Sequence, residues 1–175
     1  KVDTMNSRVE WKGYKVLKSD QTTHFGTIRF ESGDITVKEG KLQSGKFVAD
    51  INTLENIDLK DNQEMKSKLE GHLKSADFFE VEKFPTASYE ITKVTEAKSG
   101  DYNTILDGNL TIKGITKPVQ FKANVTIQNE NVSIATEPTD INREDYGLNF
   151  EIPFENGLLN KSINLQVLIK AMESK

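Results

Sequence analysis

The sequence has no cysteine, two histidines and one tryptophan in 175 residues. Without cysteine the chain forms no disulfide, no thiolate zinc site and no cysteine nucleophile, although the redox compartment stays open. The histidines, His24 and His72, are accompanied by no G-x-S-x-G, H-E-x-x-H or P-loop motif. These absences argue against a hydrolase or a metalloenzyme, and we expect neither a catalytic residue nor a metal or other cofactor.

The sequence also lacks a long hydrophobic run and an excess of basic residues. No apolar stretch approaches the roughly 18 to 20 residues of a membrane-spanning helix, and the start at Lys1-Val2-Asp3-Thr4 has no hydrophobic signal segment. The formal net charge of -4 argues against a nucleic-acid partner, because nucleic acid is normally bound by clustered Lys and Arg. Since the chain starts without methionine, we expect the mature or trimmed form of a longer product.

Alternation of apolar and polar residues with a period of two runs through most of the chain. Between Val119 and Ile127 every second residue is apolar and every residue between is polar, which is typical of a half-buried strand. Short polar sequences, such as Glu31-Ser32-Gly33-Asp34 and Lys38-Glu39-Gly40, predict turns. The predicted strands are 9–17, 24–31, 45–51, 86–94, 104–113, 119–127, 132–137 and 163–171.

One segment has a helical rather than a strand period. Asp61-Asn62-Gln63-Glu64 resembles a capping box, and Met65, Leu69 and Leu73 then recur every four residues. This pattern predicts one short helix over about 62–70, ending near Gly71.

About eight antiparallel strands with one apolar face predict an all-β barrel. Closure removes free sheet edges and leaves an interior with room for side chains or for one small ligand. A two-sheet sandwich with a filled core is the architectural alternative. The length, without a repeat or a long linker, predicts a single domain over residues 1–175.

Four stretches carry a resemblance to a known family, in the family's own order. The first combines His24-Phe25-Gly26 with 40–52; the second, 69–85, reads LEGHLKSADFFEVEKFP and is similar to HL-x-S-x-DFFD-V-x-x-YP. The third, 107–119, resembles G-x-LT-I-x-G-x-T-x-P-V, and the fourth, 141–147, resembles I-x-R-x-DFG. Together they resemble the YceI family of lipocalin-like polyisoprenoid-binding proteins, over about residues 7–172.

The resemblance implies an antiparallel lipocalin-like barrel that carries or sequesters a long-chain isoprenoid or quinone-like lipid in an apolar lumen, without catalysis. It also implies export, to the periplasm or as an envelope lipoprotein with a lipidated N-terminus outside the given sequence, and it is compatible with a homodimer. Burying hydrocarbon, at about 0.8 kcal/mol per CH₂, would supply the affinity. A filled-core scaffold or adhesion sandwich and, less favoured, an enzyme acting on a lipid or quinone are the alternatives.

The candidate lumen residues are those that alternate inward. Small ones, such as Ala49 and Ala123, leave volume that neighbours or a ligand must occupy, and we expect His24 to be structural and Arg143 to fix a loop. Phe78 and Phe79 either plug one barrel end or line its mouth. The predicted lipid-binding residues are Ile28, Phe30, Phe47, Ala49, Ile51, Leu69, Leu73, Phe78, Phe79, Tyr89, Ile91, Leu110, Phe121, Ala123, Val125, Leu165 and Val167.

Overall fold

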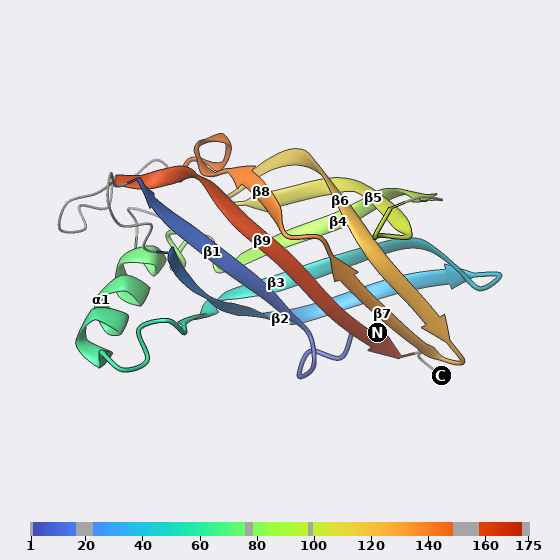
Figure 1. Cartoon of the computed structure of the whole chain (residues 1–175), viewed down its shortest axis with the longest axis horizontal. Helices are drawn as coiled ribbons and strands as arrows, with labels where there is room; N and C mark the ends of the chain where they lie inside the picture. Colours follow the sequence, from blue (N-terminus) through green and yellow to red (C-terminus); the bar gives the residue numbers. More distant parts are fainter. Residues whose placement is uncertain (1, 17–22, 76–78, 98–99, 149–157, 173–175) are drawn as a thin grey trace.

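The computed structural model describes residues 2–16, 23–75, 79–97, 100–148 and 158–172 (Figure 1). Within these residues the strands form one antiparallel sheet that closes on itself, because the first strand pairs with both the second and the last. The strands are β1 (Arg8–Val16), β2 (Thr23–Lys38), β3 (Lys41–Asn56), β4 (Thr86–Glu96), β5 (Thr104–Ile112), β6 (Ile115–Gln128), β7 (Asn131–Thr136), β8 (Thr139–Asn142) and β9 (Leu158–Met172).

Two of these strands, β7 and β8, share one position in the barrel. Both pair with β9, through Ala135 with Leu168 and through Thr139 with Leu165. The break between them contains Pro138, whose missing N–H cannot serve a sheet ladder. The predicted closed, eight-stranded antiparallel barrel is therefore confirmed, with one strand position divided in two.

The β2–β3 hairpin is longer than the sequence pattern predicted. The predicted turn at 31–34 is wrong, because β2 continues through it, with a register irregularity between Phe30 and Ser32 that lets the strand bend. The other predicted turn, at Lys38-Glu39-Gly40, is confirmed. The φ angles of Glu39 and Gly40, 55° and 76°, both lie in the left-handed region, as a tight type I′ hairpin requires.

Helix α1 (Gln63–Lys74) lies across one end of the barrel (Figure 1). Asn62 caps it, since its Oδ1 accepts a hydrogen bond from Met65 N at 3.2 Å. The prediction of a helix at about 62–70 has the correct start but the wrong end: the helix passes through Gly71, and its last carbonyls, on Leu73 and Lys74, accept hydrogen bonds from the following loop. No helix in the described part of the chain is long and apolar enough to cross a membrane.

The N-terminal residues close the seam between β2 and β9 at the opposite end of the barrel. Val2 N donates to Gly33 O at 2.9 Å, and Asp3 N donates to Lys170 O at 2.7 Å. Val2 also forms a bridge with Ala171 and is buried. The barrel is thus continued past the beginning of β1 by a short segment that no periodic pattern in the sequence predicted.

Two glycines should respond in opposite directions to the same substitution. A Cβ at Gly26 would lie 1.8 Å from the Glu55 carbonyl oxygen, whereas a Cβ at Gly71 would meet nothing within 4 Å. Gly26→Ala should therefore destabilise the fold by about 2 kcal/mol or more, since backbone must move. Gly71→Ala should stabilise it by roughly 0.5 to 1 kcal/mol, because alanine has the higher helix propensity. Urea denaturation of both variants measures this, and equal effects would contradict the described packing around Gly26.

Candidate binding cavity

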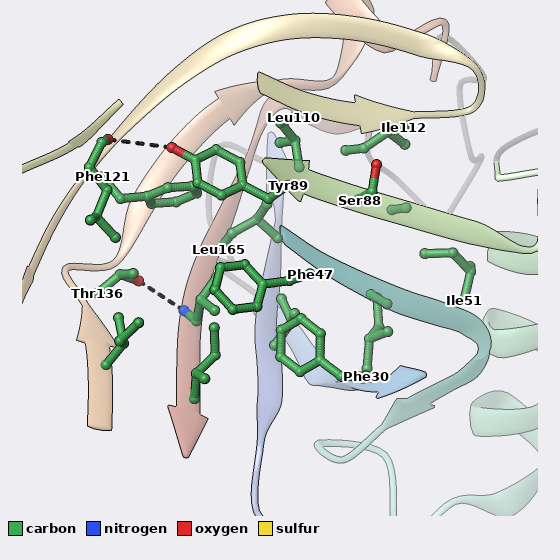
Figure 2. Close-up of a pocket in the computed structure, with 18 of the residues that line it drawn as sticks. Phe30, Phe47, Ile51, Ser88, Tyr89, Leu110, Ile112, Phe121, Thr136 and Leu165 are labelled. Carbon is green, nitrogen blue, oxygen red and sulfur yellow. Dashed lines mark hydrogen bonds between the residues drawn. The ribbon is translucent and has the colours of Figure 1, made fainter. Parts of the chain in front are cut away.

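An apolar cavity occupies the interior of the barrel (Figure 2). All eight strand positions contribute to its wall, and Phe79, from the loop after α1, adds a ring at the α1 end. No acidic or basic side chain lines it among the residues that the structure describes. The chemistry of the wall therefore suits hydrocarbon better than a charged ligand.

The size of the cavity depends on what is measured. The space open to the centre of a water-sized sphere is about 90 Å³, while all atom-free space between the lining side chains is about 800 Å³ and includes part that opens to solvent. The smaller figure is the proper comparison with closed cavities, and it well exceeds the roughly 10 to 15 Å³ that one water needs. The ligand-free barrel thus has room for a narrow chain segment without rearrangement.

Aromatic rings form one layer of the wall. Phe30 and Phe47 meet edge to face with centroids 6.2 Å apart, and Tyr89 and Phe121 do so at 5.1 Å. The next layer toward α1 is formed by Ala49, which pairs with Ala87. Toward α1, alanine methyl groups thus take the place of aromatic rings on both β3 and β4. The interior is filled at the level of the rings and open at the level of the alanines.

The Tyr89 and Thr136 hydroxyl groups on the wall are hydrogen-bonded within the protein. Tyr89 Oη–H donates to Val119 O at 2.7 Å. Leu106 O lies farther from Tyr89 Oη, at 3.4 Å, and Thr136 Oγ1 accepts from Val167 N at 2.9 Å; Figure 2 marks these last two contacts. Satisfied hydroxyls have no need of a ligand partner. The surface presented to a ligand is accordingly almost pure hydrocarbon.

Most of the predicted lumen residues meet at this cavity. Strand alternation brings them to the inner face, and Figure 2 shows several of their side chains converging on one space. Those that line the cavity are Ile28, Phe30, Phe47, Ala49, Ile51, Phe79, Tyr89, Leu110, Phe121, Leu165 and Val167. Their position is a structural fact; their contact with lipid remains a prediction.

The other predicted residues lie elsewhere. Leu69 and Leu73 are buried but hold α1 against the barrel, and Ile91 is buried beyond the aromatic layer, opposite Gly45. Ala123 faces inward with 0% exposure but is not among the residues that line the cavity. Val125 is half-buried at the end of the barrel where β2 turns into β3, which we call the hairpin end. Phe78 and the Arg143 side chain lie outside the described residues.

Several lining residues were missed in the sequence although the pattern contained them. Leu106 and Ile112 follow from Leu110 at even spacing on β5, and Ile169 follows from Leu165 and Val167 on β9. Val9, Ala87, Ser88, Ile134 and Thr136 complete the wall. Extending each predicted strand at a period of two would have found the first group, whereas the positions of Ser88 and Thr136 depend on how the sheet twists.

His24 belongs to a polar network at the α1 end. Its Nδ1 lies 2.7 Å from Asp58 Oδ2, and Asp58 Oδ1 also accepts from Phe25 N and from Asn56 Nδ2. Asn56 is fully buried and its N–H donates to Glu70 Oε2 at 2.7 Å, which ties β3 to α1. The network joins β2, β3 and the helix, so His24 holds a structural position, as a strand histidine on an inward face would.

These features define a class: an eight-stranded antiparallel β-barrel protein with an apolar interior cavity. The chain belongs to the YceI-like family, whose domain model matches residues 1–171. A UPF0312 protein of Pseudomonas putida is 26% identical over 176 residues, covering 95% of this chain and 81% of that protein. Protein YceI of Salmonella arizonae is 35% identical over 126 residues, covering 72% of this chain and 58% of that protein.

Solved structures show the same fold. The crystal structure of Burkholderia cenocepacia BcnA superposes with a TM-score of 0.75 at 16% identity, covering 98% of this chain and 100% of that one. The Campylobacter jejuni YceI protein superposes with a TM-score of 0.60 at 18% identity, covering 83% and 84%. At such identities the likeness concerns the fold alone.

Two tyrosines, the half-buried Tyr89 and the buried Tyr146, should make the fold sensitive to alkali. Burial raises the pKa of Tyr89 above its usual value, with the Asp107 carboxylate adding to the rise, and burial raises the pKa of Tyr146 to about 12. In the unfolded chain both ionise near pH 10, so the stability they give is complete below that pH and is lost as pH rises toward 12. Urea denaturation between neutral pH and about pH 12 should show this fall, and Tyr89→Phe and Tyr146→Phe should each make it shallower. Identical slopes in the three proteins would contradict the assignment.

Proposed function

We propose that the protein binds one long-chain apolar lipid, of isoprenoid or quinone-like type, in the barrel cavity and carries or sequesters it without catalysis. The observation that carries the proposal is a cavity walled by hydrocarbon, whose tyrosine and threonine hydroxyls are already hydrogen-bonded within the protein. Each buried CH₂ contributes about 0.8 kcal/mol, so a chain of several isoprene units overcomes the cost of association.

The shape of the interior supports a chain-like ligand. The aromatic layer of Phe30, Phe47, Tyr89 and Phe121 closes one side of the cavity, and the alanine layer of Ala49 and Ala87 opens toward Phe79. A flexible chain in this cavity would meet apolar side chains apart from Ser88, Tyr89 and Thr136. Phe79, which lines the cavity near α1, is only half-buried.

The non-catalytic part of the proposal rests on the chemistry of the wall. Proton transfer or nucleophilic attack requires a titratable or nucleophilic group beside the ligand, and the lining residues are apolar apart from Ser88, Tyr89 and Thr136. An enzyme acting on a lipid is the less favoured alternative. For the compartment, we propose the periplasm or an envelope-anchored form, since an apolar lipid needs a carrier to cross an aqueous space between membranes.

Mass spectrometry of an organic extract tests the proposal directly. Protein purified without detergent from its native host should yield a long-chain lipid at up to one molecule per barrel, and denatured protein treated identically should yield none. Absence of lipid from the extract, together with failure to bind an added long-chain prenyl alcohol, would contradict the proposal.

Substitution of two alanines separates a cavity wall from a filled core. Ala49→Phe places a ring in the cavity, so the variant should fold but bind a long-chain prenyl alcohol at least roughly tenfold more weakly, as loss of contact with two methylene groups would cause. Ala123→Phe is the matched control: with no cavity beside it, the ring should cost about 1 to 3 kcal/mol or more in stability. Equal destabilisation by both variants, in thermal unfolding, would show that the interior around Ala49 is solid.

A further inference from the structure

Trp11 is the single tryptophan of the chain and lies inside the barrel beside the cavity. It pairs with Leu165 of β9, and the preceding inward residue, Val9, pairs with Ile28 of β2. Leu165, Val9 and Ile28 all line the cavity. Trp11 is only 7% exposed. It is not itself among the residues that line the cavity, but its strand partners place it next to the wall, at the end nearer α1.

The indole Nε1–H of Trp11 is buried and has no hydrogen-bond partner within the described part of the chain. The indole is held tightly, since a Cβ on the facing Gly26 would lie 2.7 Å from its Cζ2 atom. An indole N–H can only donate, and a buried donor without an acceptor raises the free energy of the empty protein. A ligand atom that accepts this hydrogen bond would remove that cost on binding.

We propose that Trp11 anchors the polar group of the bound lipid and that this group is an uncharged oxygen acceptor, a carbonyl or a hydroxyl. The inference rests on the proposed function, because it assigns an orientation to the lipid in the same cavity. The lipid oxygen accepts the hydrogen bond from Trp11 Nε1 at the α1 end, and the hydrocarbon extends toward the aromatic layer. Because Trp11 does not itself line the ligand-free cavity, binding in this orientation requires the wall side chains beside it to move and expose Nε1.

The charges around this end disfavour an anionic headgroup. Gly26, which faces Trp11, pairs with Asn56, and the backbone N–H of Asn56 is held by the Glu70 carboxylate. A second carboxylate, Asp58, lies in the same network beside Asn56. A phosphate or carboxylate brought into this partly desolvated region would be repelled by both. A carbonyl or hydroxyl accepts the same hydrogen bond without that repulsion.

Three probes of equal length test the inference on the full chain: a long-chain methyl ketone, the corresponding alkane and the corresponding carboxylate. The native protein should bind the ketone most tightly. Its single-tryptophan emission should move to longer wavelength with the ketone and stay in place with the alkane, because only the ketone accepts the indole hydrogen bond. This readout needs no variant and reports on Trp11 alone.

Trp11→Phe keeps an aromatic ring and removes the N–H. It should weaken ketone binding by roughly fivefold to tenfold, the range of one hydrogen bond, and change alkane binding by less than about twofold. Phe47→Leu is the control, since it removes apolar wall and should weaken all three probes alike. The measurement is the Kd of each probe by calorimetry or by competition.

The outcomes separate this inference from the proposed function. If the native protein binds ketone and alkane equally, or if Trp11→Phe weakens both alike, the cavity binds lipid but Trp11 is only apolar wall and the inference is overturned. Tighter binding of the carboxylate than of the ketone also overturns it. If no probe binds to the native protein, both the inference and the carrier function fail.

Discussion

The pairing of β1 with β9 is the constraint on which the rest of the structure depends. Once the first and last strands are hydrogen-bonded, the sheet has no free edge and encloses one interior that every strand must share. Every second residue of each strand then points its side chain into that space. Whether the interior is solid or hollow is decided by the order of large and small side chains along the strands, and here Phe47 and Tyr89 are followed by Ala49 and Ala87.

Strand alternation made the architecture predictable from the sequence. The segments around Phe121 and Leu165 alternate so regularly that both their existence and their inner faces followed directly, and the barrel and most of the cavity wall followed from them. The family motifs added the order of the elements but no side-chain geometry. What could be predicted was the period, and the period determines which residues face inward.

The parts that could not be predicted depend on contacts between distant segments. The 31–34 sequence contains the residues of a turn, yet pairing with β3 keeps it in a strand and a register shift absorbs the irregularity. Gly71 has the composition of a helix end, yet burial of Leu73 carries the helix one turn further. Ala123 alternates correctly with its neighbours, but only the packing around it determines that it is enclosed rather than open to the cavity. In each case tertiary packing outweighed a correct local tendency.

The two ends of the barrel differ in a way that gives the cavity a direction. At the β2–β3 hairpin end, the half-buried side chains of Val94, Val125 and Ile127 share a hollow with Lys41, Gln43 and Glu96. The charged groups there are exposed to solvent, and Lys41 pairs with Glu96 at 3.2 Å. At the α1 end, the network of His24, Asp58 and Asn56 ties β2 to the end of the adjacent β3, beside a buried indole donor. A symmetric hydrocarbon would gain nothing from this difference, since its transfer free energy is the same in either orientation. An amphiphile would gain from one orientation only, so a barrel built to hold pure hydrocarbon has no physical reason to keep an unsatisfied donor at one end of its wall.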